Sequence, residues 1–182
     1  MSRFLLKQKS RKNSANLRAI VCGVISIRSV RLSQDVKEIV DVFLGISLGM
    51  LVETGFVSKD LIDKNWYSRF DMNHRLESDG FFAAASIDDA DMPVVVFNAE
   101  STLEALAWAI PHEAIHLAQM CKKDLEPSDG FSIWKGKKYP QLKATDPNYS
   151  SPNYQPWEAE ALELEESVRD ALYEKFPDLK CL

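Results

Sequence analysis

Residues 101–121 read STLEALAWAIPHEAIHLAQMC, and this stretch decides how the rest of the chain is interpreted. Its apolar side chains recur every three or four residues, which is typical of a helix with a buried face. Ser101 and Glu104 have the spacing of a capping box, in which each side chain accepts a hydrogen bond from the other residue's amide. We therefore expect a helix that begins at Ser101. Pro111 lacks a backbone N–H, so we expect it to kink or restart that helix.

The helix contains two histidines four residues apart, His112 and His116, with Glu113 directly after the first. This spacing places both imidazoles on one face, so both can reach one metal ion. Glu113 points toward the same site and is suited to act as a general base on zinc-activated water. Two of the chain's 3 histidines are used here, and the remaining one, His74, favours a structural role. The pattern predicts a Zn²⁺ site.

A catalytic zinc ion takes three protein ligands and keeps one position open. No further histidine follows within the next turns, so a carboxylate is expected, and Glu158 and Glu160 stand on a predicted helix near the carboxyl end. These two residues lie about 200° apart around the helix axis, so only one can face the metal. Leu162 and Tyr173 widen the predicted buried stripe toward Glu158. Periodicity therefore favours Glu158, with Glu160 as the alternative.

The segments around this helix predict an α+β fold. An apolar pattern of helical spacing runs from Ser33 to a stop at Gly55, and its uncharged part is too short to cross a bilayer. Turn-rich connectors separate three predicted strands, which we expect to form an antiparallel meander. The strands are residues 66–72, 81–87 and 94–98.

The part of the chain after Cys121 predicts a short hairpin, a long loop over residues 140–155, and a last helix from Pro156 to about Phe176. The three cysteines have no CxxC spacing, so neither a disulfide framework nor a cysteine zinc cage is indicated. Cys121 is interpreted as a buried packing thiol.

Charge is distributed unevenly over the 182 residues. Residues 1–31 hold eight of the 22 basic side chains and no acidic one, which leaves 14 basic against 27 acidic side chains, a net charge of −13, in residues 32–182. We interpret residues 1–31 as a flexible basic extension and residues 32–182 as one domain. The extension weakly resembles a targeting peptide but lacks a cleavage site, so a cytoplasmic location is expected. Its charge also raises contact with nucleic acid as an alternative.

Three motifs together resemble the gluzincin branch of the zincin metallopeptidases, in the small single-domain form common in bacteriophages and mobile elements. They are residues 112–119 (HEAIHLAQ), 134–139 (WKGKKY) and 156–161 (PWEAEA). The resemblance implies a zincin-like fold, in which a small antiparallel sheet packs on an active-site helix and a second, ligand-bearing helix. It implies His112, His116 and Glu158 as metal ligands and Glu113 as the general base.

In that family the strand before the active-site helix often binds the substrate backbone by strand addition. The resemblance therefore implies substrate contacts along one strand, formed by Val94, Val95, Val96, Phe97 and Asn98. A loop tyrosine could donate a hydrogen bond to the oxyanion, and the sequence leaves three candidates unranked: Tyr139, Tyr149 and Tyr154.

The expected function is that of a zinc-dependent metallohydrolase, a peptidase acting on peptides or proteins. Two alternatives remain at this point: a catalytically silent zincin-like structural or binding protein, such as a virion component, and a nucleic-acid-associated protease that uses the basic extension. Neither the substrate nor the oligomeric state follows from the sequence.

Overall fold

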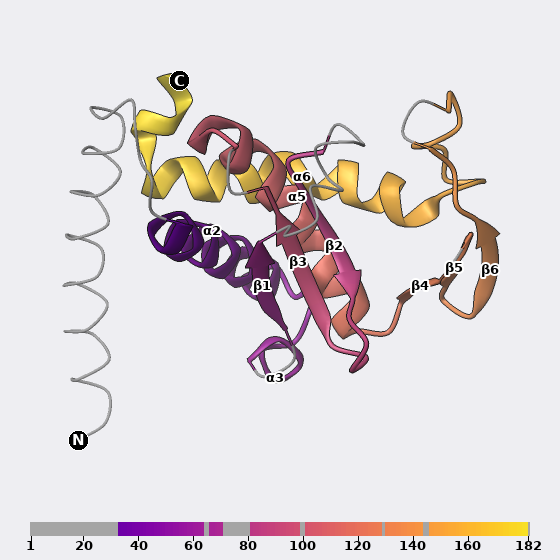
Figure 1. Ribbon diagram of the computed structural model, residues 1–182. Helices are drawn as coiled ribbons and strands as arrows, with labels where there is room; N and C mark the ends of the chain where they lie inside the picture. Colours follow the sequence, from indigo (N-terminus) through magenta and orange to yellow (C-terminus); the bar gives the residue numbers. More distant parts are fainter. Residues whose placement is uncertain are drawn as a thin grey trace. The chain divides into compact units, whose positions relative to one another are not determined.

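The computed structural model describes residues 33–63, 66–70, 81–98, 101–128, 130–143 and 146–181 (Figure 1). The chain divides into two units, Met1–Ile39 and Val40–Leu182. The predicted basic extension and His74 lie outside the described residues. Helices and two small sheets make up the described part, which is α+β as predicted.

The first sheet contains β1 (Tyr67–Phe70), β2 (Ala83–Ile87) and β3 (Pro93–Phe97), in the order β1-β3-β2. β2 pairs with β3 in antiparallel fashion, whereas β1 pairs with β3 in parallel. The predicted meander is therefore wrong, because it would place β2 in the centre. β3 is the most apolar of the three strands, and the central position removes it most completely from water.

Helix α5 (Leu103–Cys121) packs against β2 and β3, and α6 (Pro156–Lys175) packs against α5 (Figure 1). The side chains of α5 are buried around most of its circumference, which explains why the helix is apolar on more than one face. Its N-cap is Thr102, whose hydroxyl accepts from the Ala105 amide at 3.2 Å, and not Ser101 as predicted. The helix continues through Pro111 and does not restart there.

The predicted amino-terminal helix is α2 (Ser33–Glu53), and Gly55, with φ of 76°, follows it where the sequence predicted a stop. The short α3 (Lys59–Ile62) comes next. The ring of Phe43 in α2 lies 5.9 Å from the ring of Phe176, directly after α6. Across the described ranges, no helix combines the length and apolar character that crossing a membrane requires.

A second, antiparallel sheet follows α5 and consists of β4 (Leu125–Ser128), β5 (Phe131–Trp134) and β6 (Lys137–Pro140). The sequence predicted only one hairpin here and missed β4. A buried apolar cluster joins this sheet to α5 and α6, and its members are Met120, Leu125, Trp134 and Trp157. The described residues from 141 to 155 form neither helix nor strand, and α6 begins at Pro156 as predicted. A 3₁₀ helix, Pro177–Cys181, ends the described chain.

Candidate metal centre

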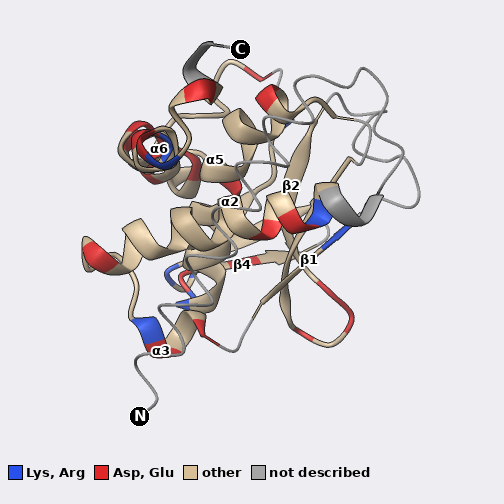
Figure 2. Cartoon of the chain, turned by 90° about the vertical axis from the view of Figure 1, so that its left-hand side faces the viewer, with Lys and Arg blue, Asp and Glu red and all other residues tan. Residues whose placement is uncertain are grey.

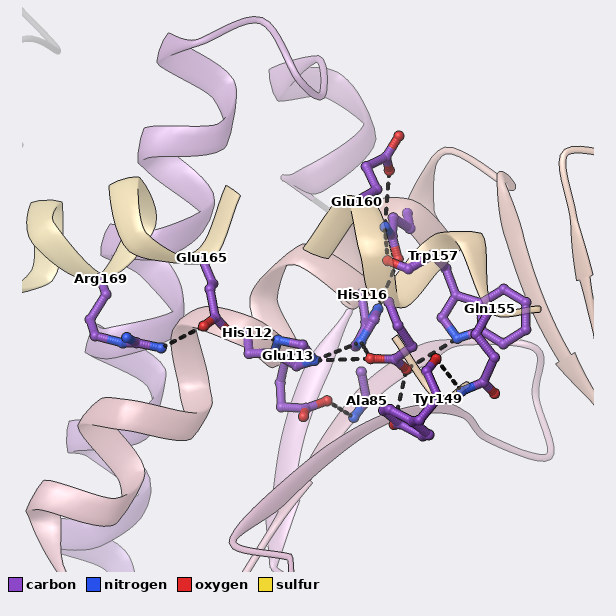
Figure 3. A network of polar contacts seen from close by, with 12 residues as sticks. Ala85, His112, Glu113, His116, Tyr149, Gln155, Trp157, Glu160, Glu165 and Arg169 are labelled. Carbon is purple, nitrogen blue, oxygen red and sulfur yellow. Dashed lines mark hydrogen bonds and ion pairs between the residues drawn. The ribbon is translucent and has the colours of Figure 1, made fainter. Parts of the chain in front are cut away.

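Three side chains from two helices converge at one point. His112 and His116 project from one face of α5 toward the first turn of α6, which carries Glu158 (Figure 3). The two Nε2 atoms are 3.0 Å apart, and Glu158 Oε2 lies 3.3 Å from His112 Nε2 and 3.4 Å from His116 Nε2. Tetrahedral zinc with bonds of about 2.0–2.2 Å separates its ligand atoms by about 3.3–3.6 Å. The three atoms therefore have spacings close to those that such an ion requires.

The remaining ring nitrogen of His116 is held by Gln119, which is buried in the same helix. His116 Nδ1 lies 2.8 Å from Gln119 Oε1, and Gln119 Nε2 donates to Trp157 O at 3.1 Å and to Glu160 Oε2 at 2.9 Å. Trp157 O and Glu160 Oε2 can only accept hydrogen bonds, so the atom of the Gln119 amide that faces them must be the NH₂ nitrogen. Gln119 Oε1 must then accept a hydrogen bond from Nδ1–H, so in the neutral His116 ring Nε2 carries the lone pair and faces the point shared with His112 and Glu158.

A carboxylate holds the corresponding nitrogen of His112. His112 Nδ1 lies 3.0 Å from Glu165 Oε2, and Glu165 Oε1 pairs with Arg169 Nη2 at 3.2 Å. The Arg169 guanidinium in turn lies 4.9 Å from the centre of the Trp108 ring. Glu165 thus orients the His112 ring as outer carboxylates commonly orient metal-binding histidines.

Glu158 is fixed by two neutral donors on its other oxygen. Tyr149 Oη and Trp157 Nε1 both donate to Glu158 Oε1, each at 3.1 Å, which leaves Oε2 directed at the histidines. Glu160 points elsewhere and accepts from Gln119 and, at 3.2 Å, from Lys135 Nζ. Of the two candidate carboxylates, the structure brings only Glu158 next to both Nε2 atoms.

Glu113 stands beside the histidines without joining the group of possible ligands. Its Oε2 accepts a hydrogen bond from the Ala85 amide in β2 at 2.6 Å (Figure 3). Burial raises the pKa of Glu113, and the neighbouring histidines offset part of that rise. A buried carboxyl with a raised pKa is suited to take and return a proton near neutral pH.

The pKa values of His112, His116 and Glu158 are shifted because basic and acidic groups lie together in a buried site. Burial alone would lower the pKa of His112, but hydrogen bonds to Glu158 and Glu165 outweigh it and raise that pKa to about 10. The pKa of His116 is raised in the same way. Burial would raise the pKa of Glu158, but the two histidines outweigh burial and hold the pKa well below its usual range. Glu158 thus favours the protonated form of both histidines, and a metal ion bound to them would compete with those protons.

Other predicted site residues lie farther from this point. Val94 and its neighbours belong to the central strand, whose two edges pair with β1 and β2, so the strand addition predicted for Val94–Asn98 has no free edge. Tyr139 packs against the Trp157 ring at 6.0 Å, and the exposed Tyr154 is not part of the cleft described below. Cys121 is buried, and burial raises its thiol pKa to about 11, as for a packing residue.

The sequence analysis missed three groups of the site, namely Glu165, Gln119 and the Ala85 amide. Glu165 stands seven residues after Glu158, two helical turns along the same face, and Gln119 stands one turn after His116. These spacings could have identified both side chains. The Ala85 amide comes from a distant strand, and no local pattern in the sequence indicates it.

Comparisons with known proteins identify no relative. No family model, no curated protein and no solved structure matches the chain.

Proposed function

We propose that the chain is a zinc-dependent peptidase in which His112, His116 and Glu158 hold the metal and Glu113 is the general base. The observation that carries the proposal is the spacing of 3.0, 3.3 and 3.4 Å among two imidazole nitrogens and one carboxylate oxygen. Two histidines and one glutamate are a known ligand set of catalytic zinc, with a fourth position open for water or substrate. The resemblance to the gluzincins stated above supports the same assignment.

A bound zinc ion would supply a Lewis acid that polarises the scissile carbonyl and lowers the pKa of water. Glu113 would take a proton from the attacking water and return it to the leaving amine. Of the three candidate tyrosines, only Tyr149 contacts a proposed ligand, since its hydroxyl donates to Glu158 Oε1. Burial and the Glu158 charge raise the pKa of Tyr149, so its hydroxyl stays protonated. A site that only stored a metal would have no need of Glu113.

The substrate strand is β2 and not β3. Phe82 and Asn98 form a hydrogen-bonded pair, since the Asn98 amide donates to Phe82 O at 3.0 Å. Hydrogen-bonded and non-bonded pairs alternate along an antiparallel ladder, so Ala83 and Ala85 direct their backbone groups away from β3. The contact between the Ala85 amide and Glu113 agrees with this direction. Among the described strands none pairs with this edge, so an extended peptide can add to it at Ala83, while the Ala85 amide stays with Glu113.

The test combines metal analysis with hydrolysis. Wild type should hold about one zinc per chain, His112→Ala and His116→Ala should each lose it, and a chelator should abolish cleavage of an unfolded protein until zinc is restored. Glu113→Gln should keep zinc and fold while cleavage falls by about 10²- to 10⁴-fold. Glu104→Gln, at an exposed position of the same helix, is the matched control and should retain activity.

Two results would overturn the proposal. One is full zinc occupancy in the double variant of His112 and His116. The other is a wild type that holds zinc but cleaves none of a broad set of unfolded proteins and peptides, which would favour a binding protein.

A further inference from the structure

The candidate metal centre opens into a cleft of about 360 Å³. Residues 81–85, residues of α5 and α6, and Tyr149, whose hydroxyl donates to Glu158, line it. His112, Glu113, His116 and Glu158 line one part of it. Four large apolar side chains line the remainder: Phe81, Phe82, Trp108 and Leu162.

These four side chains are unusual because they are exposed. Phe82 is 46% exposed, Trp108 55% and Leu162 44%, although each borders a cleft that could have been closed by packing. Within the described residues six large apolar side chains are exposed, and four of the six belong to this cleft. Exposed apolar groups that gather at one place mark a binding surface.

Leu162 was predicted to be part of the buried stripe of α6, and its exposure is therefore a correction.

The apolar side chains come from three separate segments, each close in sequence to a residue of the metal centre or its contacts. Trp108 stands one turn before His112 on α5, and Leu162 stands one turn after Glu158 on α6. Phe81 and Phe82 directly precede β2, and the β2 edge with which no described strand pairs passes Glu113 at Ala85. A peptide on that edge that reached Glu113 would therefore bring a neighbouring side chain against the apolar end.

Acidic side chains outnumber the histidines in the lining of the cleft. Glu113, Glu158 and Glu165 line it, and α6 carries further acidic side chains (Figure 2). Even with one divalent ion bound, an acidic substrate side chain near these carboxylates would be repelled. The Arg169 guanidinium, which lies 4.9 Å from the Trp108 ring, is already paired with Glu165 at 3.2 Å.

We infer that this cleft selects an extended peptide segment with a bulky apolar side chain beside the bond to be cleaved, and that it disfavours an acidic side chain at that position. The inference deepens the proposed function and rests on it. The four apolar residues would contact the substrate side chain, and the β2 edge would contact its backbone.

Binding is measured separately from cleavage, in the zinc-loaded full chain carrying Glu113→Gln. The probes are fluorescently labelled ten-residue peptides, identical except for one central residue: leucine, phenylalanine, serine or aspartate. The leucine and phenylalanine peptides should bind at least about tenfold more tightly than the aspartate peptide, since even one methylene in a hydrophobic pocket discriminates by about 10- to 200-fold. Leu162→Ser and Phe82→Ser, each added to this background, should weaken their binding about tenfold. Leu61→Ser, at an apolar position 37% exposed outside the cleft, should change nothing.

The outcomes separate the two proposals. Cleavage by wild type that is indifferent to the central residue would overturn the inference and leave the peptidase intact. An apolar binding preference without any cleavage by wild type would overturn the peptidase and leave the cleft assignment intact. Absence of binding by all four probes would overturn the inference. So would a dimer in solution that Leu162→Ser converts to monomer, because a second copy of the chain would then occupy the apolar surface.

Discussion

The two ends of the cleft differ in how their side chains are held. At the metal end, His112 and His116 each have one nitrogen engaged by a neighbour, and one Glu158 oxygen is held by Tyr149 and Trp157. At the apolar end the side chains are exposed, and Phe81, Phe82 and Leu162 carry no polar atom that needs a partner. The first arrangement holds ligand atoms at fixed distances, as a metal ion requires. The second provides area that can be buried by side chains of different shape.

The largest expected effect is loss of a ligand from the metal end. Glu158→Ala removes the carboxylate that lies beside both Nε2 atoms, and zinc affinity should fall well beyond the roughly 10- to 100-fold typical of outer contacts. Glu160→Ala removes one acceptor of Gln119 and should cost at most about 10- to 100-fold. Zinc titration against a competing chelator compares the two variants. Equal losses would show that the two carboxylates are not distinguished as the structure indicates.

A smaller effect is expected where the metal end is held in place. Gln119→Leu leaves His116 free to change its tautomer and should weaken zinc binding about 10- to 100-fold. Gln155 is the matched control because it is equally a buried glutamine with hydrogen bonds at both ends, to the Leu142 amide and to Tyr149 O. Gln155→Leu should lose folding stability, by about 1–3 kcal/mol for a buried group left unpaired, without the same loss of zinc affinity.

The readout that separates these variants is zinc affinity compared with the free energy of unfolding. If Gln119→Leu binds zinc as wild type does while both variants are equally destabilised, Gln119 contributes to stability only.

The sequence predicted what depends on local spacing. Residues four apart on a helix share a face, so the sequence alone was enough to identify the histidine pair, and the same rule favoured Glu158 over Glu160. The helix beginning at Pro156 followed from local residue preferences too. One wrong prediction was also local: Ser101 was predicted as the N-cap, whereas the structure uses Thr102, and serine and threonine are both common N-cap residues.

What depends on pairing between distant segments could not be predicted. β1 lies beside β3 and not β2 because strand order is decided by burial of the whole sheet, and turn-rich connectors do not carry that information. The position of Ala85 opposite Glu113 depends on that order. Leu162 follows the helical pattern of a buried residue and yet is exposed, and its apolar character indicates binding only once Phe81, Phe82 and Trp108 are seen beside it.

The last expected effect is a difference in pH dependence between the two ends. In the metal-free protein the pKa of His112 is raised from an ordinary 6.5 to about 10, because hydrogen bonds to Glu158 and Glu165 outweigh burial. Its ion pairs therefore stabilise the metal-free protein fully below about pH 6.5 and are lost as the pH rises through about 10. Zinc must displace the His112 proton at neutral pH, so zinc affinity should fall on acidification by roughly tenfold per pH unit for each displaced proton.

Chelator-competed zinc titrations between about pH 6 and about pH 9, with proton release measured in buffers of different ionisation enthalpy, test this slope. The four side chains of the apolar end carry no ionisable group. The ratio of affinities for the leucine and serine peptides, measured in zinc-saturated Glu113→Gln, should therefore stay constant over the same range. A zinc affinity that does not change with pH and releases no proton would contradict the histidine assignment. A leucine-to-serine ratio that follows the pH would show instead that the two ends of the cleft are not independent.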